Sequence, residues 1–231
     1  MILRQLLDYE TFTYTYLVAD EVTKEAIIID PVREQLDRDL KLIRELGFDL
    51  KYSLETHVHA DHITSADSLR KETGSKTVLG LGANVECSDI KIQDGETLDF
   101  GSYSLKAIAT PGHTNACTSY LIENFVFTGD TLFIRGTGRT DFQGGSAEAL
   151  YDSIKEKLFT LNPDTIVYPG HDYKGMTSST IAEEKLFNPR IDSGMTKEEF
   201  VEIMANLNLA QPKKIQEAVP ANIKCGKEVK L

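Results

Sequence analysis

The sequence predicts an α/β fold in which strands and helices are mixed along a chain of 231 residues. Short apolar runs rich in β-branched residues recur between segments whose apolar residues repeat at helical spacing. Apolar residues make up 41% of the chain, and no apolar run is long enough to span a membrane. No repeat or linker divides the sequence. We therefore expect one domain over residues 1–231 with a short helical C-terminal extension at about 188–231.

The first half opens with a predicted hairpin followed by a helix. Apolar and β-branched residues at 13–19 and 26–30 indicate two strands joined by a polar turn. The helical repeat that follows consists of Leu36, Leu40, Ile43 and Leu46. Gly47 suits the left-handed position after a helix end. Residues 50–55 then predict a strand that runs directly into THVHADH.

The second half continues the mixture of strands and helices. We expect a helix at about 65–73, a strand at 76–79, a strand-rich stretch at 97–128, helices at 147–161 and 177–187, and a strand at 165–168. Thr196 and Glu199 have the spacing of a capping box, which predicts one more helix in the C-terminal extension.

Charge and cysteine usage exclude several classes of protein. A formal net charge of -11 repels a phosphate backbone, so nucleic acid is not an expected partner. The N-terminus lacks a basic segment followed by an apolar one, and we predict a cytoplasmic protein that does not associate with membranes. The cysteines Cys87, Cys117 and Cys225 are odd in number and widely spaced. This spacing predicts neither a disulfide framework nor a thiolate zinc site, and it fits a reducing compartment.

All five histidines fall in three short segments that follow predicted strands. They are His57, His59 and His62 in THVHADH, His113 in TPGHT, and His171 in YPGHD. Asp61 and Asp130, the latter in FTGDT, occupy similar strand-to-loop positions. Loops at strand ends are where rigid scaffolds present functional groups, so the clustering predicts one shared site.

The residue types in these segments indicate a metal. Imidazole and carboxylate ligands together suit zinc, iron or manganese. In an extended segment, alternate side chains point the same way, so His57, His59 and Asp61 are expected to converge while His62 turns toward a neighbour. Such a segment can serve two adjacent metals.

The strings THVHADH, TPGHT, FTGDT and YPGHD together resemble the metallo-β-lactamase superfamily. The resemblance implies an αββα four-layer sandwich of two mixed β-sheets flanked by helices. More narrowly, LETHVHADHIT, FTGDTLFIRGTGRTDFQGGS, IVYPGHDYKG and the C-terminal NPR, MANLNL and VPANIKCG are similar to the persulfide dioxygenases, also called sulfur dioxygenases. This similarity covers nearly the whole chain.

The narrower resemblance implies an iron-dependent oxidoreductase of sulfur metabolism. Its catalytic metal ligands fall on His57, His113 and Asp130, with one Fe(II) per chain and zinc as the alternative metal expected on purification. The implied reaction, a step of hydrogen sulfide oxidation, converts glutathione persulfide, O2 and water to sulfite and glutathione. His59, Asp61, His62 and His171 would orient the ligands or, alternatively, bind a second metal.

The same resemblance implies where the substrate binds and which partners are expected. Arg139 and Arg190 would receive the carboxylates of glutathione, with Thr114 and Tyr173 as hydrogen-bonding neighbours. The alternative for either arginine is an ion pair within the protein. A homodimer and a separate rhodanese-type sulfurtransferase are the protein partners that we consider.

Two other functions remain open. A glyoxalase II-type thioesterase would hydrolyse S-lactoylglutathione with a dinuclear metal site, but the GTGRTDFQ string and the short C-terminal tail argue against it. A non-catalytic metal-binding protein would also retain the fold. The complete set of competent donors argues against that second alternative.

Overall fold

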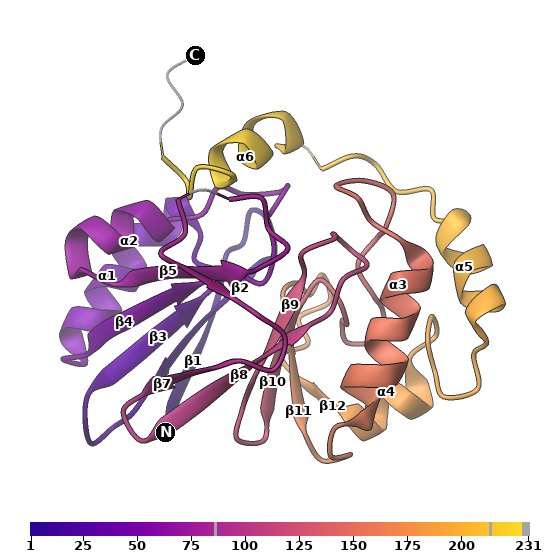
Figure 1. The fold of residues 1–231 in the computed structure, drawn as a ribbon, viewed down its shortest axis with the longest axis horizontal. Coiled ribbons are helices and arrows are strands. Elements are labelled where there is room, and N and C mark those ends of the chain that lie inside the picture. The colour runs from indigo at the N-terminus through magenta and orange to yellow at the C-terminus, as the bar shows by residue number, and fades with distance from the viewer. Residues whose placement is uncertain (86, 213, 228–231) are drawn as a thin grey trace.

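Twelve strands form two sheets of six strands each in the computed structural model, which describes residues 1–85, 87–212 and 214–227 (Figure 1). The first sheet follows chain order. Its strands are β1 (Ile2–Leu7), β2 (Tyr14–Ala19), β3 (Glu25–Ile29), β4 (Asp49–Leu54), β5 (Lys76–Gly80) and β6 (Ile90–Ile92). Strands β1 to β3 are antiparallel, whereas β3 to β6 are parallel, so the sheet is mixed.

The second sheet is also mixed. Its strands are β7 (Thr97–Phe100), β8 (Tyr103–Ala109), β9 (Thr118–Ile122), β10 (Phe125–Gly129), β11 (Ile166–Pro169) and β12 (Ser179–Thr180). All neighbouring strands are antiparallel except β10 and β11, which run parallel. The loops that follow β4, β8, β10 and β11 hold the predicted ligands and their histidine and aspartate neighbours.

The two sheets share one hydrophobic core. Tyr16 and Val18 of β2 pack in the same cluster as Tyr120 of β9 and Phe127 of β10. Leu17, between them on β2, faces the opposite side and packs with helix residues. Since both faces of β2 are covered, all of its residues are buried. The shared core supports the single-domain interpretation, although the domain boundaries stay a prediction.

Helices cover the outer face of each sheet, which completes the predicted four-layer sandwich (Figure 1). Helices α1 (Leu36–Glu45) and α2 (Ala66–Thr73) pack on the first sheet. The second sheet is covered by α3 (Ala147–Asp152), α4 (Ile181–Phe187) and α5 (Lys197–Ala205). The last helix, α6 (Ile215–Asn222), lies across the top of the molecule in this view. None of the helices described here is long and apolar enough to cross a membrane.

The elements expected from sequence periodicity are mostly present, with informative differences. The expected helix at 147–161 is continuous, but it changes from α to π geometry at Ser153–Lys157 and to a 3₁₀ turn at Leu158–Thr160. The helix expected at 177–187 starts only at Ile181, because Ser179 and Thr180 pair with β11. Thr180 then caps α4 by accepting a hydrogen bond from the Glu183 N–H at 3.1 Å.

The C-terminal extension holds two helices of different character. The capping box of Thr196 and Glu199 is confirmed at the start of α5. Phe200 of α5 is fully buried against the second sheet's helical layer, so this part of the extension belongs to the core. Residues 213 and 228–231 of the predicted extension lie outside the described residues.

The cysteine prediction is wrong. Cys87 and Cys225 form a disulfide across 138 residues of sequence, and a pair so far apart leaves no spacing signature. Cysteine usage therefore no longer supports the predicted cytoplasmic location, which stays a prediction. Cys117 is a buried free thiol, and burial raises its pKa to about 12, so it is an unreactive thiol.

Candidate metal centre

The candidate site lies at the edge where the two sheets meet. His57 follows β4 of the first sheet, whereas His113 follows β8 and Asp130 follows β10 of the second. Gly129, directly before Asp130, has a φ of +50°, and a Cβ there would lie 2.3 Å from Thr56 Oγ1. Glycine therefore allows the two sheets to approach closely at the point where the ligands converge.

His57, His113 and Asp130 come together as predicted. One ligand atom from each lies within 4.8 Å of the others, and His113 Nε2 is 3.7 Å from Asp130 Oδ2. The His57 and His113 rings are perpendicular, with centroids 4.9 Å apart. Two nitrogen atoms and one carboxylate oxygen at this spacing suit a first-row transition metal.

Hydrogen bonds outside the cluster set the orientation of both histidines. The Thr56 hydroxyl donates to Asp30 Oδ2 at 2.8 Å, so its oxygen is available to accept from His57 Nδ1 at 3.0 Å. His113 Nδ1 donates to the Arg139 carbonyl at 2.6 Å. Both rings therefore present an unprotonated Nε2 to the cluster, which is the state that binds metal. Burial also holds the pKa of His57 well below its usual value, which keeps that ring neutral.

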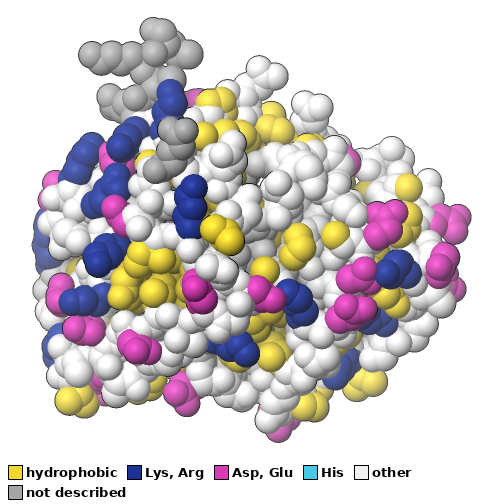
Figure 2. Space-filling view, viewed as in Figure 1, with side chains coloured by type: hydrophobic (Ala, Val, Ile, Leu, Met, Phe, Trp, Pro, Cys, Tyr) yellow, Lys and Arg dark blue, Asp and Glu magenta, His cyan; other side chains and the backbone are white. Residues whose placement is uncertain are grey.

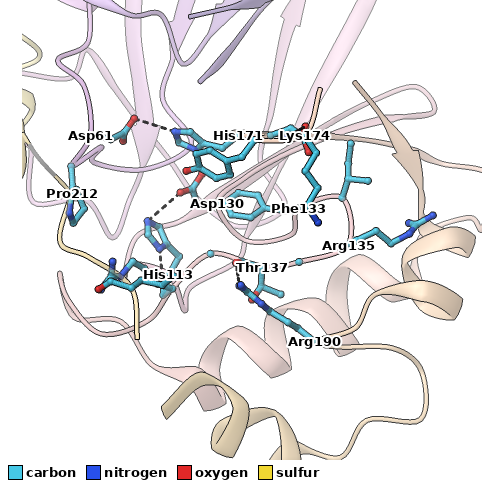
Figure 3. A pocket seen from close by; sticks show the side chains of 18 of the residues that line it. Asp61, His113, Asp130, Phe133, Arg135, Thr137, His171, Lys174, Arg190 and Pro212 are labelled. Atoms are coloured by element: carbon cyan, nitrogen blue, oxygen red, sulfur yellow. Dashed lines mark hydrogen bonds and ion pairs between the residues drawn. The ribbon is translucent and has the colours of Figure 1, made fainter. Parts of the chain in front are cut away.

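Asp130 is oriented by His171. His171 Nδ1 donates to Asp130 Oδ1 at 2.8 Å, which leaves Oδ2 for the cluster. His171 Nε2 lies 3.0 Å from Asp61 Oδ2, so the imidazole bridges two carboxylates (Figure 3). Burial would raise the pKa of Asp130, but the charge and hydrogen bond of His171 outweigh it and keep that pKa well below its usual range. The Asp130 carboxylate is therefore ionised, as a metal ligand must be.

His59 and Asp61 do not join His57 in one donor group as predicted, whereas His62 turns toward a neighbour, Asp61, as predicted. Residues 57–62 form bends rather than an extended strand, so the alternation of side chains does not apply. His59 turns inward, with Nε2 3.1 Å from Asp30 Oδ1 and 3.3 Å from Glu55 Oε2. His62 Nδ1 lies 3.0 Å from Asp61 Oδ2. His59, Asp61 and His62 still form a group that could hold a second ion, since one ligand atom from each lies within 4.8 Å of the others.

A pocket of about 460 Å³ opens beside the cluster (Figure 3). Its floor includes Asp61, His113, Asp130 and His171. All five histidines of the chain are buried, and the face in Figure 2 shows no histidine side chain. This pocket gives access to the candidate metal centre, and its volume suits a small-molecule substrate.

The predicted substrate residues differ in their placement. Arg190 lines the pocket and donates through Nη1 to the Thr137 carbonyl at 2.6 Å. Arg139 also lines the pocket, but it forms a bidentate ion pair with Asp141 in which both N–O distances are 2.6 Å. Tyr173 is exposed at the rim and stacks on the His171 ring. Thr114 is buried and is absent from the described pocket lining. Its hydroxyl makes a hydrogen bond with Cys117 Sγ at 3.2 Å.

Sequence reasoning missed three residues around the site. Asp30 and Glu55 are buried beneath His59, and Lys174 lines the pocket. Asp30 directly follows β3, the parallel neighbour of β4, so its place at the same sheet edge as His57 could have been inferred. Lys174 follows His171 by three residues, but nothing in its sequence context distinguishes it from a surface lysine.

Two mixed sheets between helical layers, with histidine and aspartate donors at their common edge, define a metal-dependent enzyme of the αββα type. The family model of the metallo-beta-lactamase superfamily matches residues 8–83 and 88–171. The chain belongs to this superfamily.

Three relatives show which branch of the superfamily is most similar. Human "Persulfide dioxygenase ETHE1, mitochondrial" is 47% identical over 98% of this chain and 89% of its own length. The crystal structure of ETHE1 from Myxococcus xanthus has a TM-score of 0.95 and 52% identity, and the match covers 98% of this chain and 100% of that one. "Glyoxylase B2" of Dictyostelium discoideum is less similar, at 34% identity over 95% of this chain and 89% of its own length.

Proposed function

We propose that this chain is a persulfide dioxygenase, which oxidises the terminal sulfur of glutathione persulfide. One persulfide, one O2 and one water give one glutathione, one sulfite and two protons. The observation that carries the proposal is the identity of 47% with human persulfide dioxygenase over 98% of the chain. The convergence of His57, His113 and Asp130 beside a pocket supports it.

We assign Fe(II) to the three-residue cluster, with zinc as the competing metal. Two histidines and one carboxylate with open positions are typical of non-heme iron oxygenases. Bound iron would supply the coordination positions at which O2 and the persulfide sulfur meet. The protein's part is to fix the tautomers of His57 and His113 through Thr56 and the Arg139 carbonyl, and to keep Asp130 ionised through His171. These three contacts fix the direction of every donor atom before the metal binds.

One metal per chain is favoured by how the remaining donors are used. Asp61 is hydrogen-bonded to both His62 and His171. The Nε2 atom of His59 is directed at Asp30 and Glu55 rather than at the pocket. A second ion would have to displace the contacts of Asp61, although His59 Nδ1 and His62 Nε2 have no hydrogen-bond partner among the described residues. We therefore infer that His59, Asp61, His62 and His171 orient the site and its ligands.

The pocket offers two cations for the two carboxylates of glutathione. Arg135 and Arg139 also line the pocket, but each is paired with a carboxylate of the protein. Arg190 and Lys174 have no such partner among the described residues, and Lys174 extends into the pocket in Figure 3. Burial lowers the pKa of the Arg190 guanidinium, but the group stays charged. A substrate carboxylate would therefore form a favourable charge-assisted hydrogen bond with it.

Lys174 is positioned by the turn around it. Asp172 is buried, and its Oδ2 accepts hydrogen bonds from the backbone N–H groups of Lys174 at 2.8 Å and Met176 at 2.7 Å. This turn fixes the Lys174 backbone at the pocket rim close to Tyr173. We propose that Arg190 is the main carboxylate receptor and that Lys174 is a weaker, more exposed one. Arg139 keeps its predicted place at the substrate pocket, but its hydrogen-bond donors are already engaged.

Anaerobic metal analysis combined with oxygen uptake tests this function. Reconstituted protein should carry one Fe per chain, consume one O2 per glutathione persulfide and release sulfite. His57→Ala and Asp130→Ala should lose both iron and oxygen uptake. Stoichiometric iron without persulfide-dependent oxygen uptake would refute the proposed function.

The thioesterase remains the second candidate, because the donor group of His59, Asp61 and His62 is present and a Dictyostelium glyoxylase is a relative. Two metals per chain with hydrolysis of S-lactoylglutathione in the absence of O2 would support it. Absence of bound metal after anaerobic purification would instead favour a non-catalytic protein. The cytoplasmic location, a homodimer and a separate sulfurtransferase partner stay predictions.

A further inference from the structure

The loop that carries the first metal ligand is held by side-chain amides rather than by a strand. We call residues 57–62 the metal-binding loop. Its carbonyls at Val58, His59 and His62 accept hydrogen bonds from side chains. Gln143 Nε2 donates a hydrogen bond to the Val58 carbonyl at 2.8 Å. Because a buried irregular backbone needs such partners, the shape of this loop depends on residues far away in the sequence.

Asn222 makes most of these contacts. Its Nδ2 donates to the His59 carbonyl at 2.9 Å and to the His62 carbonyl at 2.8 Å. Its Oδ1 accepts from the Thr64 N–H at 2.9 Å. The carboxamide is buried, with 4% of the residue exposed. One side chain therefore ties the middle of the metal-binding loop to the segment that follows it.

Asn222 is the last residue of α6, and little apolar contact holds this helix. Ala218 and Ala221 of α6 form a small cluster with Ile63, separate from the main core. Three residues beyond Asn222, Cys225 is joined to Cys87 in the segment between β5 and β6. The Cys225 carbonyl also accepts from the Asp67 N–H at 3.1 Å. The disulfide is thus the covalent restraint nearest to the Asn222 contacts.

We propose that Asn222 is a positioning residue of the metal centre and that the Cys87–Cys225 disulfide locks it in place. Reduction of the disulfide by a thiol would release the end of α6, loosen the metal-binding loop and lower the affinity for metal. The metal centre would then respond to the thiol balance of its surroundings. This inference does not depend on which reaction the metal catalyses.

The redox step is a thiol-disulfide exchange with two equivalents of a small thiol. The Sγ of Cys87 is the accessible target, because Cys225 is 2% exposed while Cys87 is half-buried. A first thiolate attacks Cys87 Sγ, forms a mixed disulfide and releases the Cys225 thiolate, which takes up a proton. A second thiolate attacks the small-molecule sulfur and releases the Cys87 thiolate, which is protonated in turn. Two protein thiols and one small-molecule disulfide result.

Substitution of Asn222 tests the positioning role. Asn222→Ala should weaken Fe(II) binding by about 10- to 100-fold, as for other groups that orient metal ligands. Fe(II) affinity is measured anaerobically by competition with a chelator, and amide hydrogen exchange in residues 57–64 should become faster. Leu40→Ala is the matched control, because it removes a buried side chain of α1 far from the loop. If Asn222→Ala merely lowers the melting temperature as Leu40→Ala does, with unchanged Fe(II) affinity, the positioning role is refuted.

The second arm leaves Asn222 intact and so remains decisive if Asn222→Ala fails to fold. Alkylation and mass spectrometry count the thiols before and after treatment with glutathione. The reduced wild-type protein and Cys87→Ser should show the same loss of Fe(II) affinity, and glutathione should have no further effect on Cys87→Ser. If reduction changes neither Fe(II) affinity nor amide exchange in residues 57–64, the proposed lock is wrong.

Discussion

The Arg190 guanidinium, which has no carboxylate partner among the described residues, has the most direct consequence for substrate binding. A charge-assisted hydrogen bond to a partly buried arginine is worth about 1.5–3 kcal/mol. We expect Arg190→Ala to raise KM for glutathione persulfide by about 10- to 100-fold, while iron content stays unchanged. Steady-state oxygen uptake and metal analysis on the same preparation measure both quantities. Equal loss of iron would show that Arg190 serves the structure instead.

Arg139→Ala is the informative comparison. Its guanidinium pairs with Asp141 and donates to the carbonyls of Ala210 and Leu209, at 2.6 and 3.3 Å. The side chain therefore ties the segment after α5 to the pocket wall. Its removal should lower thermal stability as well as affinity, which separates it from Arg190.

Gly170 provides a second test at the scale of single residues. A Cβ at this position would lie 2.6 Å from Asp130 Oδ1 and 3.1 Å from the Gly129 Cα. Gly170→Ala should therefore displace the carboxylate ligand and lower iron content at least 10-fold, an effect of the size seen when ligand orientation is lost. Gly194→Ala, where the nearest atom is a side-chain oxygen at 3.3 Å, is the control. Full iron occupancy in Gly170→Ala would contradict the assigned geometry of Asp130.

Sequence reasoning identified the ligands but not the direction of each side chain. Residue type and position at strand ends gave the five histidines, Asp61 and Asp130 as candidate donors, and the family resemblance selected His57, His113 and Asp130 among them. The orientation of His59 was missed because its ring is held by Asp30 and Glu55. The extended conformation predicted for THVHADH gave no reason to expect these two contacts. Contacts between residues distant in sequence decide which donors face the pocket, and periodicity contains no record of them.

At the scale of elements, strongly periodic segments were predictable and weakly patterned ones were not. Helix α1 was found from its apolar repeat and its following glycine. Strand β1, whose residues are mostly half-buried at the edge of the first sheet, was missed. Helix α6 was expected only as part of a helical tail, since it contains Pro220 and few large apolar residues. Tertiary contacts and the disulfide fix such elements, so local sequence is a poor guide to them.

Helix α1 contains a carboxylate that should make stability depend on pH. Asp39 is buried, and burial raises its pKa to about 6 even though Arg38 Nε lies 2.8 Å from Oδ1. Its pKa in the unfolded chain is the lower, ordinary value, so the folded state binds the proton more tightly. Asp39 therefore favours folding when protonated, and this contribution is lost as pH rises from about 4 through about 6.

Asp39→Asn removes the charge and keeps the acceptor for Arg38. The variant should gain about 1–3 kcal/mol in the free energy of unfolding over the wild type at pH 7.5, and much less at pH 4.5. Urea unfolding at the two pH values measures this difference. Asp37→Asn, in the same turn but exposed, controls for the loss of one negative charge. An equal gain for both variants at pH 7.5 would mean that burial of Asp39 is not the cause.

At the scale of the whole molecule, a metal bound by the three-residue cluster would link its two halves. His57 belongs to the half that forms the first sheet, whereas His113 and Asp130 belong to the second. A metal that binds only when the halves are correctly packed stabilises the folded state by mass action, by about 2.7 kcal/mol at a free concentration 100 times its Kd. For a chain of this size, that corresponds to about 5–10 °C in Tm.

Removal of the metal should therefore lower Tm by about 5–10 °C. Differential scanning calorimetry with and without a chelator, under anaerobic conditions, measures this change. The His57→Ala variant is the control, because it retains the shared core but lacks the ligand from the first sheet. Its Tm should already be low and should not respond to the chelator. An equal fall in Tm for both proteins would mean that the chelator acts elsewhere, and that the ion does not join the two halves through His57.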